Sequence, residues 1–208
     1  MFVLGGLVCA TWLSAQDYQK TAYGIKAAAG GVDVEVQFFT PSVVRVVKSP
    51  QGEHFEKKSL AVVASPGEVG VKVGIKDGAI VMDTKVLQVN LDTSTGAFSY
   101  RTADGKLLLA EKPVEKSFVP FDDAGDATYN VYQAFKLDAD EAIYGLGQLQ
   151  NGKMSQRGVR KNMIQGNVED VSPFFQSTKG YGLYWDNYSP TLFTDNEEET
   201  SFRSGVGD

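Results

Sequence analysis

The chain has 208 residues, and its 20 lysines and arginines stand against 26 aspartates and glutamates, for a formal net charge of -6. Hydrophobic residues make up 42% of the composition, which supports a packed core and excludes a wholly disordered chain. The basic residues form no stripe, so we expect no nucleic-acid partner, because phosphate binding needs a positive field. Cysteine and histidine occur once each, as Cys9 and His54. We therefore expect no disulfide framework, no metal site and no cofactor.

An apolar run opens the chain, from Phe2 to Leu13, and small residues follow it. This pattern is typical of a secretory signal peptide, although the usual positive residues before the run are absent. The run is too short to span a bilayer as a helix, so no membrane partner is expected. We predict a signal peptide over residues 1–16 and a domain over residues 17–208 that is exported without lipidation, to the periplasm or outside the cell. The alternative is a buried N-terminal strand.

The first half of the domain shows period-two alternation of apolar and polar residues, which is typical of half-buried β-strands. Strands are predicted over residues 32–38, 43–47, 69–75, 79–82, 87–91, 98–100 and 107–109. Asp77-Gly78 lies between two of these runs and indicates a hairpin, because type I′ turns need positive φ at both central positions. Residues 112–128 show no pattern, and we predict a loop there.

Strands resume at Tyr129 and continue to the end of the chain. They are predicted over residues 129–137, 161–165, 174–177, 182–185, 191–193 and 201–203. No window before Asn130 has helical periodicity, and strands recur about every eight to twelve residues with turn signals between them. The pattern predicts an all-β fold, an antiparallel β-sandwich with few or no helices.

The stretch from Ile143 to Asn187 holds most of the functional information. Two segments rich in glycine and aromatic residues, 144–147 and 180–187, flank a polar loop. The loop contains Arg157, Gln165, Asn167, Glu169, Asp170, Pro173, Phe174 and Phe175. We interpret the glycines as marks of bulges or of close backbone approach rather than of chemistry. Asp186-Asn187 suits a turn whose side chains bond to the local backbone.

Several short motifs in this stretch carry a resemblance to a known family. They are Tyr144-Gly145-Leu146-Gly147-Gln148, Arg157-Gly158, Asn167, Pro173-Phe174, Gly180-Tyr181-Gly182 and Asp186-Asn187. In this order and spacing, the sequence resembles glycoside hydrolase family 31, and looks like the N-terminal β-sandwich of its exported α-xylosidases and α-glucosidases. The resemblance implies a galactose-mutarotase-like supersandwich and extends back to the strand at Val43-Val44-Arg45.

In that family a (β/α)-barrel follows the sandwich and carries the aspartate nucleophile and the aspartate acid/base of a retaining glycosidase. Such a barrel takes about 250 residues with alternating helices, and the sequence has neither. The chain ends at Gly205-Val206-Gly207-Asp208 without a helix or cap. We therefore expect it to stop before the barrel, to contain no catalytic residue, and to be inactive unless joined to its own barrel.

The resemblance also implies that one loop of the sandwich helps to bind the non-reducing-end sugar through an acid in an Asn-x-Asp stretch. The matching stretch is Asn167-Val168-Glu169-Asp170, so either acid can be the match. Carboxylates are acceptors that take two sugar hydroxyls at once in charge-assisted hydrogen bonds. We therefore expect Asn167, Glu169, Asp170 and the apolar ring of Phe174 to contact an α-linked oligosaccharide.

Each of these residues also has a simpler interpretation. Glu169 and Asp170 would be solvated loop acids, which is what most acidic loop residues are. Phe174 and Phe175 would be core residues at the start of a strand. Arg157 would either pair with an acid across the loop or lie on the surface.

Other functions remain open for the chain as a whole. A free-standing carbohydrate-binding sandwich usually needs several exposed aromatic residues, and Trp12 and Trp185 are the only tryptophans. An aldose epimerase needs an acid and a base on opposite sides of the sugar, commonly histidine with glutamate, and the lone His54 argues against it. Counting the accessory domain of an α-glycosidase as the first, a purely structural module is the fourth possibility.

Overall fold

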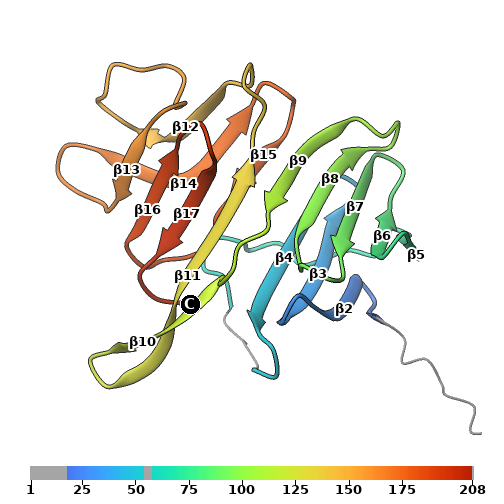
Figure 1. Ribbon diagram of the computed structural model, residues 1–208. Coiled ribbons are helices and arrows are strands. Elements are labelled where there is room, and N and C mark those ends of the chain that lie inside the picture. The colour runs from blue at the N-terminus through green and yellow to red at the C-terminus, as the bar shows by residue number, and fades with distance from the viewer. Residues whose placement is uncertain (1–17, 54–57, 208) are drawn as a thin grey trace, which may run out of the picture.

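The computed structural model describes residues 18–53 and 58–207, which form antiparallel β-strands and contain no helix (Figure 1). The predicted all-β fold is confirmed. The predicted signal peptide, Cys9 and His54 lie outside the described residues. Within the residues described, no helix is long and apolar enough to cross a membrane.

The strands form three sheets. Their bounds are β1 Gln19–Lys20, β2 Gly24–Ala29, β3 Val32–Thr40, β4 Val43–Pro50, β5 Lys72–Lys76, β6 Ala79–Asp83, β7 Leu87–Asp92, β8 Phe98–Thr102, β9 Leu107–Lys112, β10 Phe118–Asp123, β11 Asp126–Lys136, β12 Ile143–Gln148, β13 Arg160–Met163, β14 Asp170–Ser177, β15 Gly182–Tyr184, β16 Thr191–Asp195 and β17 Thr200–Ser204. A ten-stranded sheet has the order β13-β16-β17-β11-β9-β8-β7-β6-β5, with β10 paired to β11. The smaller sheets are β1-β2-β3-β4 and β12-β14-β15.

Both smaller sheets cover the same face of the ten-stranded sheet. Tyr100 lies opposite Leu109, and Phe135 lies opposite Glu111, two residues further along β9. Side chains directly opposite one another, or two residues apart on one strand, point to the same face. Two hydrophobic clusters therefore lie side by side on this face, and Tyr100 packs against both of them.

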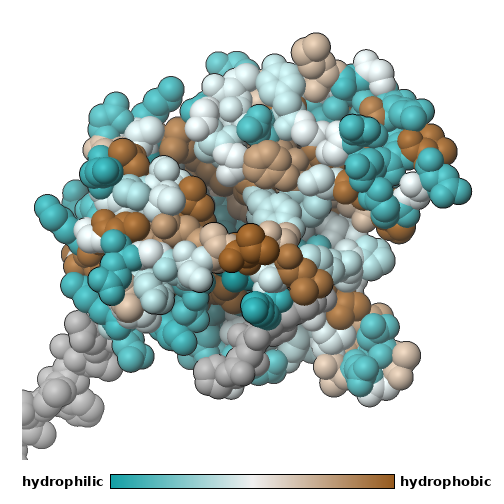
Figure 2. Space-filling view, turned by 180° about the vertical axis from the view of Figure 1, so that it is seen from behind, coloured by the Kyte–Doolittle hydropathy of each residue, from teal (hydrophilic) through white to brown (hydrophobic). Residues whose placement is uncertain are grey.

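The first cluster packs β2, β3 and β4 against β6, β7 and β8, and the second packs β12 and β14 against β9, β11, β13, β16 and β17. In the second cluster the ring of Phe202 stacks on Trp185 at 5.6 Å and on Phe175 at 6.3 Å between centroids. The apolar residues therefore gather between the two layers. Seen from behind, the molecule presents mostly hydrophilic residues, with hydrophobic ones scattered among them (Figure 2).

The Asp77-Gly78 hairpin is confirmed. It joins β5 to β6, and the two residues have φ of 50° and 78°. Strand β5 begins at Lys72, three residues later than the alternating pattern predicted. Strand β2 was not predicted, because its Gly-Ile-Lys-Ala-Ala-Ala sequence has few of the β-branched and aromatic residues that signal a strand.

The prediction of a loop over residues 112–128 was correct for residues 113–117 and wrong for residues 118–128. Strands β10 and β11 form a hairpin there, turned by Ala124 and Gly125 with φ of 55° and 102°. The hairpin projects from the sheet at the lower left of Figure 1, and most residues of β10 are exposed. Without a buried face there is no alternation to detect. Pro120 is tolerated because β10 is an edge strand that pairs only with β11.

A buried ion pair joins the four-stranded sheet to the ten-stranded one. Lys48 Nζ lies 2.6 Å from Glu111 Oε2 and 3.1 Å from Gln133 Oε1. The backbone N–H of Phe98 donates to the same carboxylate at 2.9 Å. Burial raises the pKa of Glu111, and the nearby Lys48 opposes that shift. Breaking such a pair leaves an uncompensated buried charge, so an arrangement of the layers that separated Lys48 from Glu111 would be costly.

The pairing of β12 with β14 shifts register between Gly145 and Gly147, because three residues of β14, 172–174, lie opposite one residue of β12. The residue between them, Leu146, has φ of 64° and is fully buried. A Cβ atom at Gly145 would lie 2.7 Å from the carbonyl oxygen of Phe174, and one at Gly147 would lie 2.1 Å from that of Asp170. The interpretation of these glycines as bulge and close-approach positions is confirmed.

Replacing Gly147 tests this close approach. We expect Gly147→Ala to lower the free energy of unfolding by about 3 kcal/mol or more, because strain at positive φ adds to overpacking against backbone. Gly152→Ala is the matched control, since Gly152 has φ of 69° and no atom within 4 Å of the added Cβ. The control should lose only about 1–2 kcal/mol. Denaturant titrations give both values, and equal losses would contradict the close approach.

Candidate functional site

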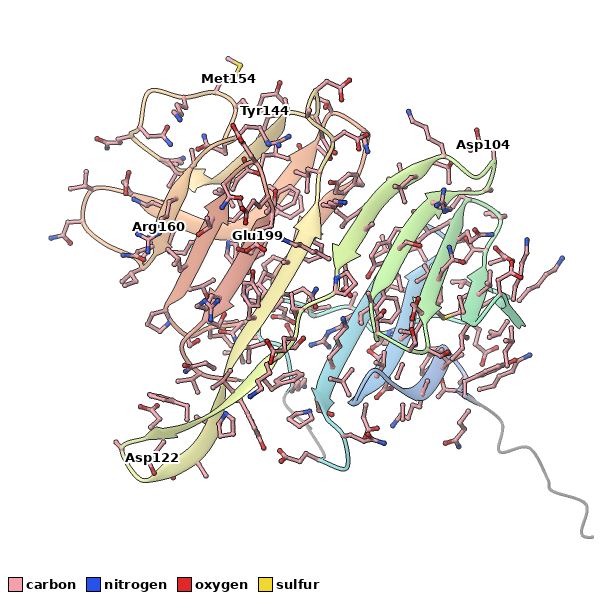
Figure 3. The ribbon with its side chains drawn as sticks, in the orientation of Figure 1. Asp104, Asp122, Tyr144, Met154, Arg160 and Glu199 are labelled. Atoms are coloured by element: carbon pink, nitrogen blue, oxygen red, sulfur yellow. The ribbon has the colours of Figure 1, made fainter. Side chains whose placement is uncertain are left out.

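An open depression of about 320 Å³, which we call the hollow, lies between the end of β12 and the loop that joins β13 to β14. It is lined by Gln148, Leu149, Gln150, Gln165, Gly166, Asn167, Val168, Glu169 and Asp170. Three of the four residues predicted to bind sugar, Asn167, Glu169 and Asp170, therefore meet in one hollow. Figure 3 shows this end of the molecule, where Arg160 and Met154 are labelled.

The loop over residues 164–169 crosses from one layer of the sandwich to the other. Strand β13 belongs to the ten-stranded sheet, whereas β14 belongs to the three-stranded sheet. Strand β14 begins at Asp170, four residues earlier than predicted, because Asp170 and Val171 pair with Gln148 and Gly147 across the bulge. Asp170 is therefore held by a strand rather than by a loop.

Glu169 is engaged through both of its carboxylate oxygens. Oε2 forms an ion pair with the ammonium group of Lys161. Oε1 accepts a hydrogen bond from the backbone N–H of Gln150 at 3.3 Å. The side chain of Gln150 in turn donates to the carbonyl oxygen of Val168 at 2.9 Å. The end of β12 and the crossing loop are thus tied together at Glu169.

Asp170 keeps one oxygen open. Its Oδ1 accepts from the side-chain amide of Gln165 at 2.7 Å, and Gln165 also accepts from the N–H of Val171 at 3.2 Å. Oδ2 has no hydrogen-bond partner among residues 18–53 and 58–207, and neither does the exposed amide of Asn167. These groups can therefore donate to or accept from a bound molecule without losing an internal bond.

Phe174 lies away from the depression. It faces Tyr184 across the strand pair, and its ring covers Gly182, where an added Cβ would be 2.9 Å from two ring carbons. Phe175 points to the opposite face and is fully buried among the rings of Phe193 and Phe202. The core interpretation is correct for Phe175, and Phe174 packs on the outer face of its sheet.

Arg157 pairs with an acid, as one of its two interpretations predicted, but the acid is Asp195 on β16 rather than one across the loop. The Nε of Arg157 lies 3.0 Å from Oδ2 of Asp195. Asp195 is buried, with only 4% of its surface exposed. The Nη1 of Arg157 donates to the carbonyl oxygens of Asp138 and Glu141. One guanidinium therefore ties the loop before β12 and the loop after it to β16.

The carboxylate of Glu141 is 3% exposed and continues this network. It accepts from the hydroxyl groups of Ser177 at 2.5 Å and Tyr181 at 2.6 Å, while Lys179 Nζ lies 3.5 Å away. Burial and the bond to Glu141 raise the pKa of Tyr181 well above its usual value. The hydroxyl of Tyr181 is therefore a permanent donor that fixes the turn between β14 and β15.

The turn at Asp186-Asn187 was only half anticipated. Asn187 Oδ1 accepts from the N–H of Ser189 at 3.0 Å, as the turn interpretation predicted. Asp186 instead reaches across the molecule, and its Oδ2 lies 3.0 Å from Arg45 Nη2 on β4. The side chain joins the two smaller sheets, which local sequence could not indicate.

Sequence reasoning also missed Lys161. The sequence contained a signal for it, because Lys161 lies two residues before the apolar Met163 and so shares its face of β13. Met163 is buried, so that face points inward. In register Lys161 lies opposite Phe193, which is fully buried. A lysine at an inward-facing strand position needs an acidic partner, because an unpaired buried charge is costly.

The family follows from the comparison with known proteins. Residues 33–193 match the family model described as the glycosyl hydrolase 31 N-terminal galactose mutarotase-like domain. The chain belongs to glycoside hydrolase family 31. The resemblance in the glycine-rich and aromatic motifs is thereby confirmed, and so is the supersandwich fold that it implied.

Relatives of this family 31 chain are longer proteins. An α-xylosidase of Saccharolobus solfataricus is 31% identical over 170 residues, which cover 77% of this chain and 23% of that protein. The crystal structure of the α-xylosidase from Xanthomonas citri matches with a TM-score of 0.79 at 31% identity, over 86% of this chain and 20% of that one. An α-xylosidase from a soil metagenome, solved with xylose, shares the fold with a TM-score of 0.78 at 20% identity, over 92% of this chain and 31% of that one. The chain thus spans less than a third of each.

Removing the guanidinium of Arg157 tests how much its pairing with Asp195 stabilises the fold. We expect Arg157→Met to lower the free energy of unfolding by about 3 kcal/mol, because it leaves the buried Asp195 without its cation. The control is Arg160→Met, at an exposed position on β13, which should change stability by no more than about 0.5 kcal/mol. Thermal unfolding measures both, and similar small effects would contradict a structural role for Arg157.

Proposed function

We propose that this chain is the non-catalytic N-terminal domain of an α-glycosidase, an α-xylosidase or α-glucosidase, and that the depression beside residues 164–170 completes a donor-sugar subsite. The observation that supports this most is the position of the hollow. The loop that the family resemblance singled out lines it, together with the end of strand β12. The protein would be exported, to the periplasm or outside the cell.

The chemistry of the hollow suits a neutral sugar. Side-chain amides of Gln148, Gln150, Gln165 and Asn167 offer both donors and acceptors, and the acid Asp170 offers an open oxygen. A carboxylate that accepts sugar hydroxyls forms charge-assisted hydrogen bonds, which are stronger than neutral ones. The expected ligand is the end of an α-linked oligosaccharide.

Bond cleavage belongs to another part of the protein in this proposal. Retaining hydrolysis needs two carboxyl groups about 5 Å apart on either side of the glycosidic bond. The two acids of the hollow, Glu169 and Asp170, follow one another in the chain, and Lys161 neutralises the first. We assign the nucleophile and the acid/base to a (β/α)-barrel that joins this domain in the complete enzyme.

A free-standing sugar-binding module is less well supported. Trp185, the tryptophan of the described residues, is not an exposed platform, because its ring stacks on Phe202 and its Nε1 donates to Ser204 Oγ at 2.8 Å. The aromatic residues on the outer face of the three-stranded sheet, Tyr144, Phe174 and Tyr184, do not line the hollow. The hollow is therefore suited to complete a site rather than to form one alone.

The division of labour is tested by comparing the chain with the complete product of its gene. We expect the chain alone to release no nitrophenol from aryl α-xylosides or α-glucosides, because it lacks the carboxyl pair. We expect the gene to encode a following (β/α)-barrel and its complete product to hydrolyse one of these substrates. Turnover by the chain alone, or a stop codon directly after Asp208, would contradict the proposal.

The role of the loop is tested in that complete product. Replacing Asp170 with alanine should lower kcat/KM about ten- to a hundredfold, the usual effect of losing a hydrogen bond to a charged group. The fold should survive, since Asp170 is exposed. Asp123→Ala, an exposed acid in the distant β10–β11 hairpin, is the control and should leave the kinetics unchanged. Unchanged kinetics in Asp170→Ala would refute the loop assignment.

A further inference from the structure

The ion pair between Lys161 and Glu169 connects the two layers at the base of the crossing loop. Lys161 lies on β13 in the ten-stranded sheet, and Glu169 immediately precedes β14 in the three-stranded sheet. Their side chains are 24% and 26% exposed, so solvent screens the pair only in part. Residues 164–169, the loop that ends at Glu169, belong to no strand that would hold them.

We propose that Lys161 and Glu169 form a clamp that positions this loop, and that Glu169 does not contact the sugar. The proposal rests on the proposed function, since the loop position matters to activity only if a sugar binds there. Both oxygens of Glu169 already have partners, in Lys161 and the N–H of Gln150. A sugar hydroxyl would have to displace one of these bonds, whereas Oδ2 of Asp170 is open.

The clamp also has a reason to persist. In register, Lys161 stands opposite the fully buried Phe193, so its side chain leaves β13 on the face that packs against the core. Without Glu169 that charge would remain at the edge of the apolar layer with a lost partner, which is costly. Gln150 adds a third point, because its N–H holds Glu169 and its side chain holds the carbonyl of Val168. The loop is thereby fixed to both β12 and β13.

This arrangement divides the two neighbouring acids by role. Glu169 is a positioning residue whose charge Lys161 balances, and Asp170 is the contacting acid. It also makes Lys161 a residue on which activity depends although it need not touch the substrate. Replacing either Lys161 or Glu169 with a neutral residue should therefore lower activity as much as replacing both.

A double-mutant cycle in the complete gene product tests this division. We expect Lys161→Met and Glu169→Gln each to lower kcat/KM about tenfold, chiefly through KM, and the double variant to be no worse than either one, because coupled residues are not additive. Lys161→Arg should restore activity, since it keeps the charge. Asp170→Asn should add its own loss to any of these. Lys136→Met, an exposed lysine on β11, is the control.

The backbone amide of Gln150 gives a readout that does not depend on activity. Its hydrogen exchange in the chain should accelerate in Lys161→Met and Glu169→Gln but stay unchanged in Lys161→Arg and Asp170→Asn. Additive kinetic effects, or a strong effect of Glu169→Gln with none of Lys161→Met, would overturn the clamp. If neither the clamp variants nor Asp170→Asn change kcat/KM, but the exchange of the Gln150 amide responds as expected, the clamp stands and the proposed sugar subsite fails.

Discussion

Burial of one face of the ten-stranded sheet is the constraint on which the structure depends. That sheet is too long for either smaller sheet to cover alone, so two sheets share its face and two apolar clusters form beside one another. Tyr100 belongs to the boundary between them. Between the layers, carboxylates that are buried pair with a lysine or an arginine, as Glu111 does with Lys48 and Asp195 does with Arg157.

The candidate site is a consequence of this layering. Wherever the chain crosses between layers, its backbone leaves the sheet ladders and polar side chains must hold it. The crossing from β13 to β14 is held by Lys161, Gln150 and Gln165. The same crossing leaves Asn167 and one oxygen of Asp170 exposed to a ligand. Structural and ligand-binding polar groups are therefore neighbours, and chemical type alone does not tell them apart.

Strand prediction succeeded where one face of a strand is buried. Strands β3 and β7 alternate in sequence and in burial, because their apolar residues meet the facing sheet. It failed for β10, whose residues are mostly exposed, and for β2, which is rich in alanine. The glycines of β12 were interpreted correctly, since close backbone approach leaves no room for a side chain whatever the surrounding fold.

The amino-acid sequence was enough to predict the all-β class, the family and the stretch in which the candidate site lies. These follow from local periodicity and from motif order, which are properties of the chain alone. The folded arrangement was needed to show that Glu169 is engaged by Lys161 and Gln150, that Asp170 keeps an open oxygen, and that Phe174 faces away from the hollow. The physical reason is that charge pairing and side-chain direction depend on which strands become neighbours. The register shift between β12 and β14 and the shared face of the long sheet set those neighbours.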